Sequence, residues 1–165
     1  MERVRPATLA GTWYPGRSRE LAAAVRGYLE DDNPDAAAEL APFLPPAAGG
    51  PAAAPAAPGW RAGAARPLLA VAPHAGYAYS GPTAGRIYRR LAPWEYDRVF
   101  ILAPSHRYRL SVVSVAGVAA YATPLGEAAV ARDVAGALAG APGFCSVAAA
   151  HAAEHAEEIQ LPFLQ

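Results

Sequence analysis

The chain has 165 residues, 53% of them hydrophobic, which suits one globular domain with its own core. Its fourteen basic residues, all arginines, balance fourteen acidic ones, so no overall charge favours a nucleic acid or an anionic membrane as a partner. No signal peptide is visible, and no window holds the roughly eighteen apolar residues that would span a membrane. The lone cysteine, Cys145, excludes an internal disulfide. We therefore expect a cytoplasmic protein.

The first predicted element is an amphipathic helix at 18–31, where Leu21, Val25 and Leu29 share one face. The sequence then changes character, because residues 33–67 are dominated by proline, alanine and glycine. Such a composition opposes regular structure. We expect a flexible surface insertion within the domain.

Beyond the insertion, short apolar runs alternate with helical patterns. The runs at 68–72 and 98–103 predict strands buried on both faces, and the helix predicted between them covers 81–92. Further strands are expected at 111–117 and 144–148, and further helices at 127–140 and 152–160. This alternation indicates an α/β fold, with a mostly parallel or mixed central sheet flanked by helices.

The chain stops inside an apolar run at 159–165, with no signal that would end a helix. Apolar side chains need a surface on which to pack. We therefore expect residues 1–165 to form a single α/β domain that is incomplete at its C-terminal end.

Two histidines follow the two predicted strands directly. His74 comes just after 68–72, and His106 comes just after 98–103. Strands joined by one helix lie parallel, so both histidines should emerge at the same edge of the sheet, where open α/β proteins bind ligands. Two converging imidazoles are typical of a metal site. The alternative for each histidine alone is that it only forms hydrogen bonds with backbone groups of its own loop.

A third group of candidates lies in the sequence HAAEH at 151–155. On a helix, His151 and His155 would share one face, and Glu154 completes the H-x-x-E-H pattern of inverted zinc peptidases. In that hypothesis both histidines bind zinc and Glu154 is the general base. The alternative is a solvated helix start.

Several motifs in order resemble one known family. They are GTWYP at 11–15, PHAGYAYSGPTAG at 73–85, APSH at 103–106, TPLG at 123–126 and EHAEEIQLPFLQ at 154–165. These motifs resemble the MEMO family, whose bacterial members are named AmmeMemoRadiSam system protein B. The resemblance runs from near residue 5 to the last residue and implies a fold similar to class III extradiol dioxygenases of the LigB type.

The resemblance also implies a site. His74 and His106 match two histidine metal ligands, and His155 matches a third histidine that serves as acid/base beside a non-haem metal. The remaining ligand, a cysteine, is expected beyond Gln165. Cys145 does not match it, and we expect a buried, inert thiol there. Iron or copper is the expected metal.

Aromatic side chains are expected around the same cleft, or equally in the core. They are Trp13, Tyr14, Tyr77 and Tyr79. The sequence departs from the family pattern after the third histidine, where Ala156 and Glu157 replace a serine and an aliphatic residue, and Glu158 is retained. We expect these changes to affect local packing more than metal binding.

Three functions remain open at this point. The first is a metal-dependent redox or dioxygenase-like enzyme built on His74 and His106. The second is a non-catalytic module that binds a peptide or partner in a vestigial cleft, with AMMECR1-type and radical SAM proteins as the partners that the family name implies. The third is the zinc peptidase, which requires His151 and His155 instead.

Overall fold

The computed structural model describes residues 4–31 and 66–165. The predicted insertion at 33–67 lies outside the described residues, apart from its last two positions. Within the described part of the chain, no helix is long and apolar enough to cross a membrane.

Short strands form two small sheets. The strands are β1 (Val4–Arg5), β2 (Val113–Ser114), β3 (Ala120–Thr123), β4 (Gly126–Ala129) and β5 (Phe144–Cys145). In the three-stranded sheet the order is β1-β3-β4, with β1 parallel and β4 antiparallel to β3. The second sheet pairs β2 with β5 in parallel. The predicted fold class is confirmed at this level, as a mixed α/β structure with a small mixed sheet flanked by helices.

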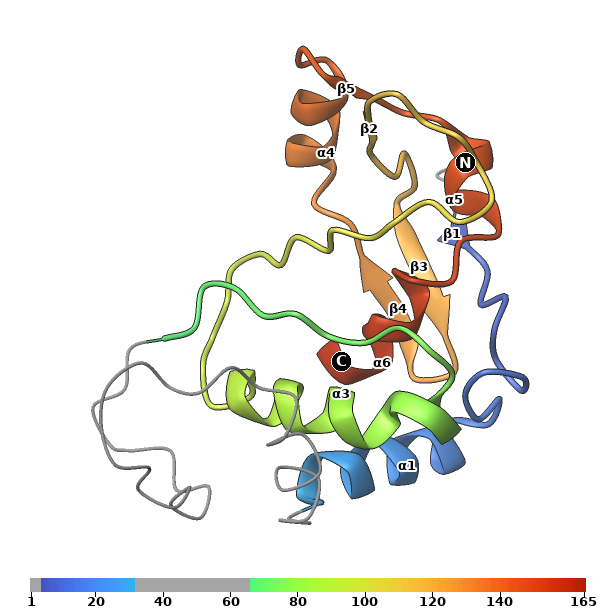
Figure 1. The fold of residues 1–165 in the computed structure, drawn as a ribbon, viewed down its shortest axis with the longest axis vertical. Helices are drawn as coiled ribbons and strands as arrows, with labels where there is room; N and C mark the ends of the chain where they lie inside the picture. The colour runs from blue at the N-terminus through green and yellow to red at the C-terminus, as the bar shows by residue number, and fades with distance from the viewer. Residues whose placement is uncertain (1–3, 32–65) are drawn as a thin grey trace, which may run out of the picture.

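Two longer helices, α1 (Ser18–Glu30) and α3 (Tyr77–Leu91), pack against each other on one side of the molecule (Figure 1). The prediction of a helix at 18–31 is therefore right to within one residue. Helix α3 begins before the predicted 81–92. Its first residue, Tyr77, donates its backbone N–H to the carbonyl of Trp13, so the extra turn is stabilised from outside the helix.

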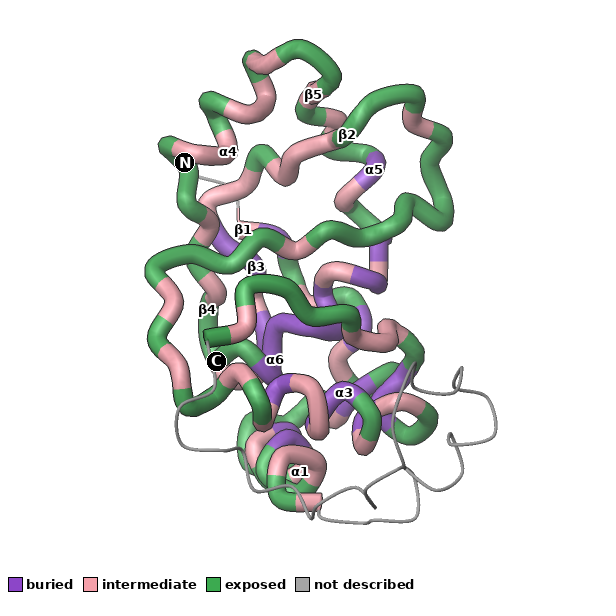
Figure 2. Tube along the Cα trace, turned by 60° about the vertical axis from the view of Figure 1, so that its left-hand side comes forward, coloured by how far each residue is buried: buried purple, intermediate pink, exposed green. Residues whose placement is uncertain are grey.

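The core lies between these two helices and the C-terminal segment. Figure 2 shows the buried stretches concentrated around α3 and α6 (Leu161–Leu164). The core contains apolar and aromatic side chains of distant segments, among them Leu9, Tyr14, Leu21, Val25, Tyr77, Tyr88, Ile159 and Phe163. The apolar run at the end of the chain is thus a core element.

The second half of the chain differs from the prediction in two helices. Residues 127–129, predicted as helix, belong to β4, and helix α4 (Arg132–Ala139) begins only after it. The predicted helix at 152–160 is also wrong. Helix α5 (Ala148–Ala152) ends where that helix should begin, and only the short 3-10 helix η2 (Glu158–Gln160) follows.

A side chain explains the missing helix. One carboxylate oxygen of Glu154 accepts hydrogen bonds from the backbone N–H groups of His155 and Ala156. Such local bonds compete with the i to i−4 bonds of a helix. The turn between α5 and η2 is therefore fixed by Glu154.

The apolar runs at 68–72 and 98–103 are not strands of either sheet. Both are extended, and Leu69 and Leu102 are 82% and 86% exposed. A strand needs a neighbouring strand to which its backbone N–H and C=O groups can hydrogen-bond, as well as buried side chains. Apolar composition predicts the burial but not the neighbouring strand. Both segments lie on the same side of α3 and run in the same direction in Figure 1, but they do not form the predicted parallel strands.

Candidate metal centre

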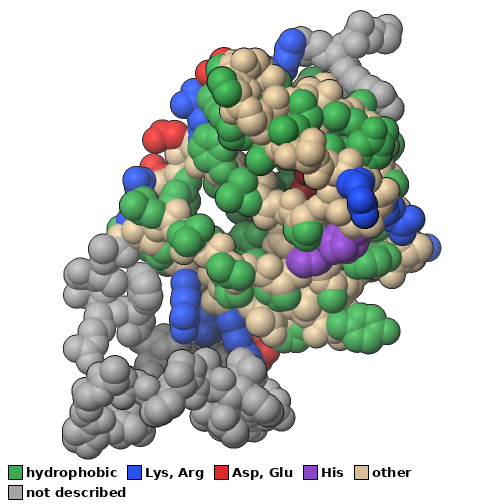
Figure 3. Space-filling view, turned by 45° about the horizontal axis from the view of Figure 1, so that its top comes forward, with side chains coloured by type: hydrophobic (Ala, Val, Ile, Leu, Met, Phe, Trp, Pro, Cys, Tyr) green, Lys and Arg blue, Asp and Glu red, His purple; other side chains and the backbone are tan. Residues whose placement is uncertain are grey.

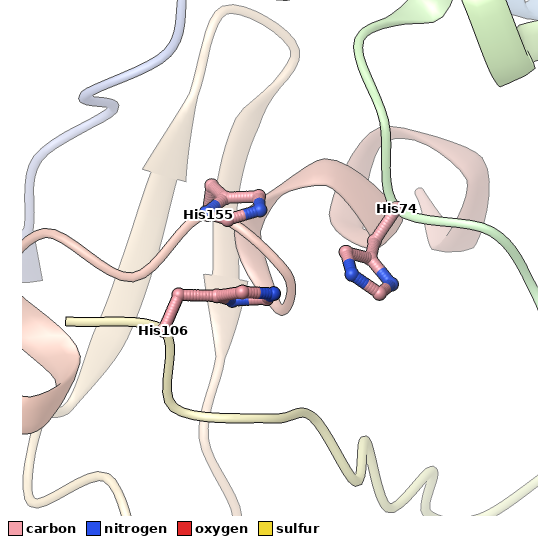
Figure 4. Close-up of side chains that lie close together, drawn as sticks. All are labelled: His74, His106 and His155. Atoms are coloured by element: carbon pink, nitrogen blue, oxygen red, sulfur yellow. The ribbon is translucent and has the colours of Figure 1, made fainter. Parts of the chain in front are cut away.

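Three separate segments bring His74, His106 and His155 together (Figure 4). His74 lies in the loop before α3, His106 follows the extended segment 98–103, and His155 lies in the turn between α5 and η2. Each offers one ring nitrogen, and these nitrogens all lie within 4.8 Å of one another. We call these three residues the histidine cluster.

The cluster is compact and partly open to solvent. The ring centroids of His106 and His155 are 4.3 Å apart, and that of His74 lies 5.2 Å and 5.7 Å from them. The His106 side chain is 38% exposed, whereas that of His155 is 15% exposed. Figure 3 shows histidine side chains at the surface, among hydrophobic and basic ones. An ion could therefore reach the cluster from solvent.

Glu154 contacts two of the three histidines, His106 and His155, at Nδ1 of each ring. Its Oε1 lies 3.0 Å from Nδ1 of His106 and 3.2 Å from Nδ1 of His155, and its Oε2 accepts the backbone N–H of His106 at 2.8 Å. The side chain is 5% exposed. A carboxylate that holds the inner nitrogen of a histidine ring is a common support for metal-ligating histidines.

The environment lowers the pKa of Glu154 and of His155. Burial opposes ionisation of Glu154, but the backbone N–H groups of Ala156 and His106, with the His106 ring, outweigh it and lower the pKa of Glu154 to about 2. An ionised carboxylate only accepts hydrogen bonds, so Nδ1 of His106 is the ring nitrogen that donates to Glu154. Burial also lowers the pKa of His155, which favours the neutral imidazole that binds metals.

The side chain of Trp13 covers one side of the cluster. Its ring lies 4.6 Å from that of His155, centroid to centroid. Trp13, His74, Tyr79 and His155 line one groove of about 620 Å³. Trp13 and Tyr79 therefore lie at the cleft, whereas the other two predicted aromatic residues, Tyr14 and Tyr77, are buried in the core.

Two core side chains hold the loop that carries His74. Gln160 donates its amide to the carbonyl of Pro73 at 3.0 Å and accepts the hydroxyl of Tyr88 at 2.8 Å. Tyr77 donates its hydroxyl to the carbonyl of Ile159 at 3.1 Å. Sequence reasoning missed Gln160, although a polar residue inside the apolar run at the chain end was a usable signal.

A second missed group lies beneath the cluster. Arg5 donates to the backbone carbonyls of His151 and Glu154, at 2.7 Å and 2.6 Å, and its third bond reaches Glu158. The guanidinium thereby fixes the backbone at both ends of the turn from His151 to Glu154, directly before His155. No local pattern near residue 5 predicts this contact, because its partners lie about 150 positions away in the sequence.

His151 lies outside the histidine cluster. Its Nε2 lies 3.0 Å from Oγ of Ser114, and its Nδ1 lies 3.1 Å from Oε1 of Glu157, so both ring nitrogens have protein partners. His151 lies in the last turn of α5, whereas His155 lies past the helix. His151 and His155 therefore do not share a helical face, as the H-x-x-E-H hypothesis requires. Glu154 instead contacts the rings of His106 and His155.

Cys145 lies in β5 and is also outside the cluster. We expected a buried thiol, but the side chain is partly exposed. In the described part of the chain its strand pairs only with β2, in a two-stranded sheet that leaves its faces incompletely covered.

The comparison with known families agrees with the motifs. The family model described as Memo-like protein matches residues 5–165. The chain belongs to the Memo-like family. The match includes all three residues of the histidine cluster, as well as Arg5 and Glu154.

The curated relatives include proteins of animals and archaea. Protein memo-1 homolog of Caenorhabditis elegans is 30% identical over 164 residues, which cover 99% of this chain and 39% of the relative. A MEMO1 family protein of Methanobrevibacter smithii is 33% identical over 165 residues, 98% of this chain and 52% of that protein. Another, from Methanopyrus kandleri, is 43% identical over 97 residues, 58% of this chain and 34% of that protein. The chain thus spans between 34% and 52% of the length of these Memo-like relatives.

Proposed function

We propose that this Memo-like chain binds a redox-active metal ion, iron or copper, through His74 and His106, with His155 beside the ion as an acid/base group. The observation that carries the proposal is the convergence of three ring nitrogens, from three segments, within 4.8 Å. Metal–nitrogen bonds are about 2.0–2.1 Å long, so ligand nitrogens lie about 3–4 Å apart around an ion.

The residues present fit such an ion chemically. Imidazole nitrogens suit iron and copper, and Glu154 contacts Nδ1 of His106, which leaves Nε2 as the ring nitrogen that would bind an ion. Two nitrogen donors, His74 and His106, also leave coordination positions for other ligands or a substrate. When bound, a redox-active ion supplies one-electron or oxygen chemistry at the cleft.

His155 has a different task in this proposal. Its pKa is lowered, chiefly by burial, so its imidazole is neutral near pH 7 and can accept a proton at Nε2. Its ring packs on Trp13, which keeps it facing the groove. His155 therefore serves as the group that moves a proton next to the ion.

The wider role rests on the family resemblance. We place the chain in an AmmeMemoRadiSam-type system, in the cytoplasm, with AMMECR1-type and radical SAM proteins as partners and a dioxygenase-like cleft. The names of the relatives state no reaction. Metal binding without turnover would instead fit a non-catalytic member that binds a partner in the same cleft.

Anaerobic titration calorimetry with Fe(II) and with Cu(I) tests the proposal on the full chain. His74→Ala and His106→Ala should each weaken binding at least about 10-fold, since each removes a ligand. His151→Ala is the matched control and should bind like the wild type. Unchanged binding in the first two variants would refute the site. In a parallel titration with Zn(II), loss of binding in His151→Ala, with His74→Ala unaffected, would favour the peptidase.

A further inference from the structure

A second polar group lies outside the histidine cluster and has the geometry of an activated serine. Oγ of Ser114 lies 3.0 Å from Nε2 of His151. On the other side of the ring, Nδ1 of His151 lies 3.1 Å and 3.3 Å from the two carboxylate oxygens of Glu157. A hydroxyl, an imidazole and a carboxylate in this order are the components of a nucleophilic relay.

The relay is held rigidly at each member. Tyr121 donates its hydroxyl to Glu157 at 2.8 Å, and Arg5 donates to the carbonyl of His151 at 2.7 Å. Ser114 lies in β2, and its Oγ accepts the backbone N–H of Val147 at 3.0 Å. That N–H group fixes the position of Oγ beside the imidazole.

The three residues also line a cavity. Ser114, His151 and Glu157 border a groove of about 740 Å³, whose walls include the apolar side chains of Ile101, Leu110 and Val112. His151 and Glu157 are each only 13% exposed, so the relay is shielded from bulk water while its serine borders the groove. An apolar wall beside a nucleophile suits an aliphatic acyl chain.

We propose that Ser114, His151 and Glu157 form an acyl-transfer site that hydrolyses carboxylic esters of short aliphatic acids. Ser114 Oγ bonds to the ester carbonyl carbon while its proton passes to Nε2 of His151. The carbon–oxygen bond to the alcohol then breaks, and the imidazolium returns the proton to the departing oxygen. Water attacks the acyl-serine with the same base, which releases the acid and restores the hydroxyl.

In this site Ser114 and His151 are catalytic residues, and Glu157 is a positioning residue. Glu157 accepts from Nδ1–H and so presents the lone pair of Nε2 to the serine hydroxyl. The metal of the proposed function takes no part, because neither His74, His106 nor His155 belongs to the relay. The two proposals can therefore fail separately.

The first test is labelling of the full chain with a fluorophosphonate probe in the presence of EDTA, with the adduct located by mass spectrometry. We expect an adduct on Ser114, none after Ser114→Ala, and full labelling of Ser105→Ala, a second serine on the same groove. Locating the adduct in the wild type needs no variant to fold. No adduct, an adduct elsewhere, or labelling abolished by EDTA would overturn the proposal.

The second test measures hydrolysis of p-nitrophenyl butyrate. His151→Gln should lower kcat about 100-fold, since it removes the general base. Glu157→Gln should lower kcat with little change in KM, and Glu157→Asp should recover part of it. The relay is refuted if Glu157→Gln leaves kcat unchanged, or if kcat of Glu157→Asp is as low as that of Glu157→Gln. In either case the hydrogen bonds of Ser114, His151 and Glu157 only stabilise the packing of β2 against α5.

Discussion

Arg5 and Glu158 form a buried ion pair between the two ends of the described chain, with Nη1 2.6 Å from Oε2 and side chains 4% and 0% exposed. The carboxylate is fully hydrogen-bonded, because it also accepts from the hydroxyls of Thr8 and Tyr14 and from the backbone N–H of Leu9. Arg5 in turn binds the two carbonyls before His155. The pair thus links the N-terminal segment to the turn that carries one histidine of the cluster.

Glu158→Gln should destabilise the fold strongly. The substitution leaves the Arg5 charge buried without its counterion. It also turns an amide N–H₂ toward the N–H of Arg5 or of Leu9, neither of which can accept, at a cost of about 3–5 kcal/mol. Urea unfolding measures the difference in free energy. Glu20→Gln is the matched control, because its ion pair with Arg17 is exposed and should be worth less than about 1 kcal/mol. Similar losses in the two variants would show that the buried pair has no special role.

The stability of the chain should fall in acid through Glu154. Its pKa is lowered from 4.5 to about 2, so its ionised form stabilises the folded state above pH 4.5, and that contribution is lost as the pH falls toward 2. Glu154→Gln cannot titrate and lacks this contribution at every pH. We therefore expect the difference in unfolding free energy between wild type and variant to shrink below about pH 4.5. A constant difference would contradict the lowered pKa.

Glu154→Gln should also weaken metal binding at neutral pH. The amide is a poorer acceptor than the carboxylate for Nδ1–H of His106, and loss of this support typically costs 10- to 100-fold in metal affinity. Calorimetry with Fe(II) gives the comparison. Glu157→Gln, which changes a nearby carboxylate that contacts His151 rather than the cluster, should retain wild-type affinity. Equal losses in both variants would indicate a general charge effect.

Gly85→Ala should disrupt the packing of α1 on α3. A Cβ at this position would overlap the backbone carbonyl of Tyr28, which cannot rotate away, so we expect a loss of about 1–3 kcal/mol or more. Gly27→Ala, on α1, meets nothing within 4 Å and should instead stabilise the helix by up to about 1 kcal/mol. Chemical denaturation of both variants checks the opposite signs, and two losses of equal size would refute the close approach.

The sequence by itself predicted several features from local pattern. The amphipathic period placed α1 within one residue of its observed end, because one apolar face facing the core is enough to define a helix. The placement of His74 and His106 after two apolar runs predicted that they would lie together. Their ring centroids are 5.2 Å apart. The order of motifs predicted the family, and the match over residues 5–165 confirms it.

Only the tertiary structure decided which partner each polar group takes. The sequence HAAEH has the spacing of a helical pair, yet Glu154 bonds backbone N–H groups in a turn and separates His155, in the cluster, from His151, in a network with Ser114 and Glu157. Likewise, the apolar runs at 68–72 and 98–103 have the composition of strands but do not pair with any strand of the described structure. Sequence periodicity predicts which side chains are buried. Hydrogen-bond partners, in contrast, can lie as far apart as Arg5 and Glu158, which are 153 residues apart, and over such separations sequence spacing does not determine the distance in space.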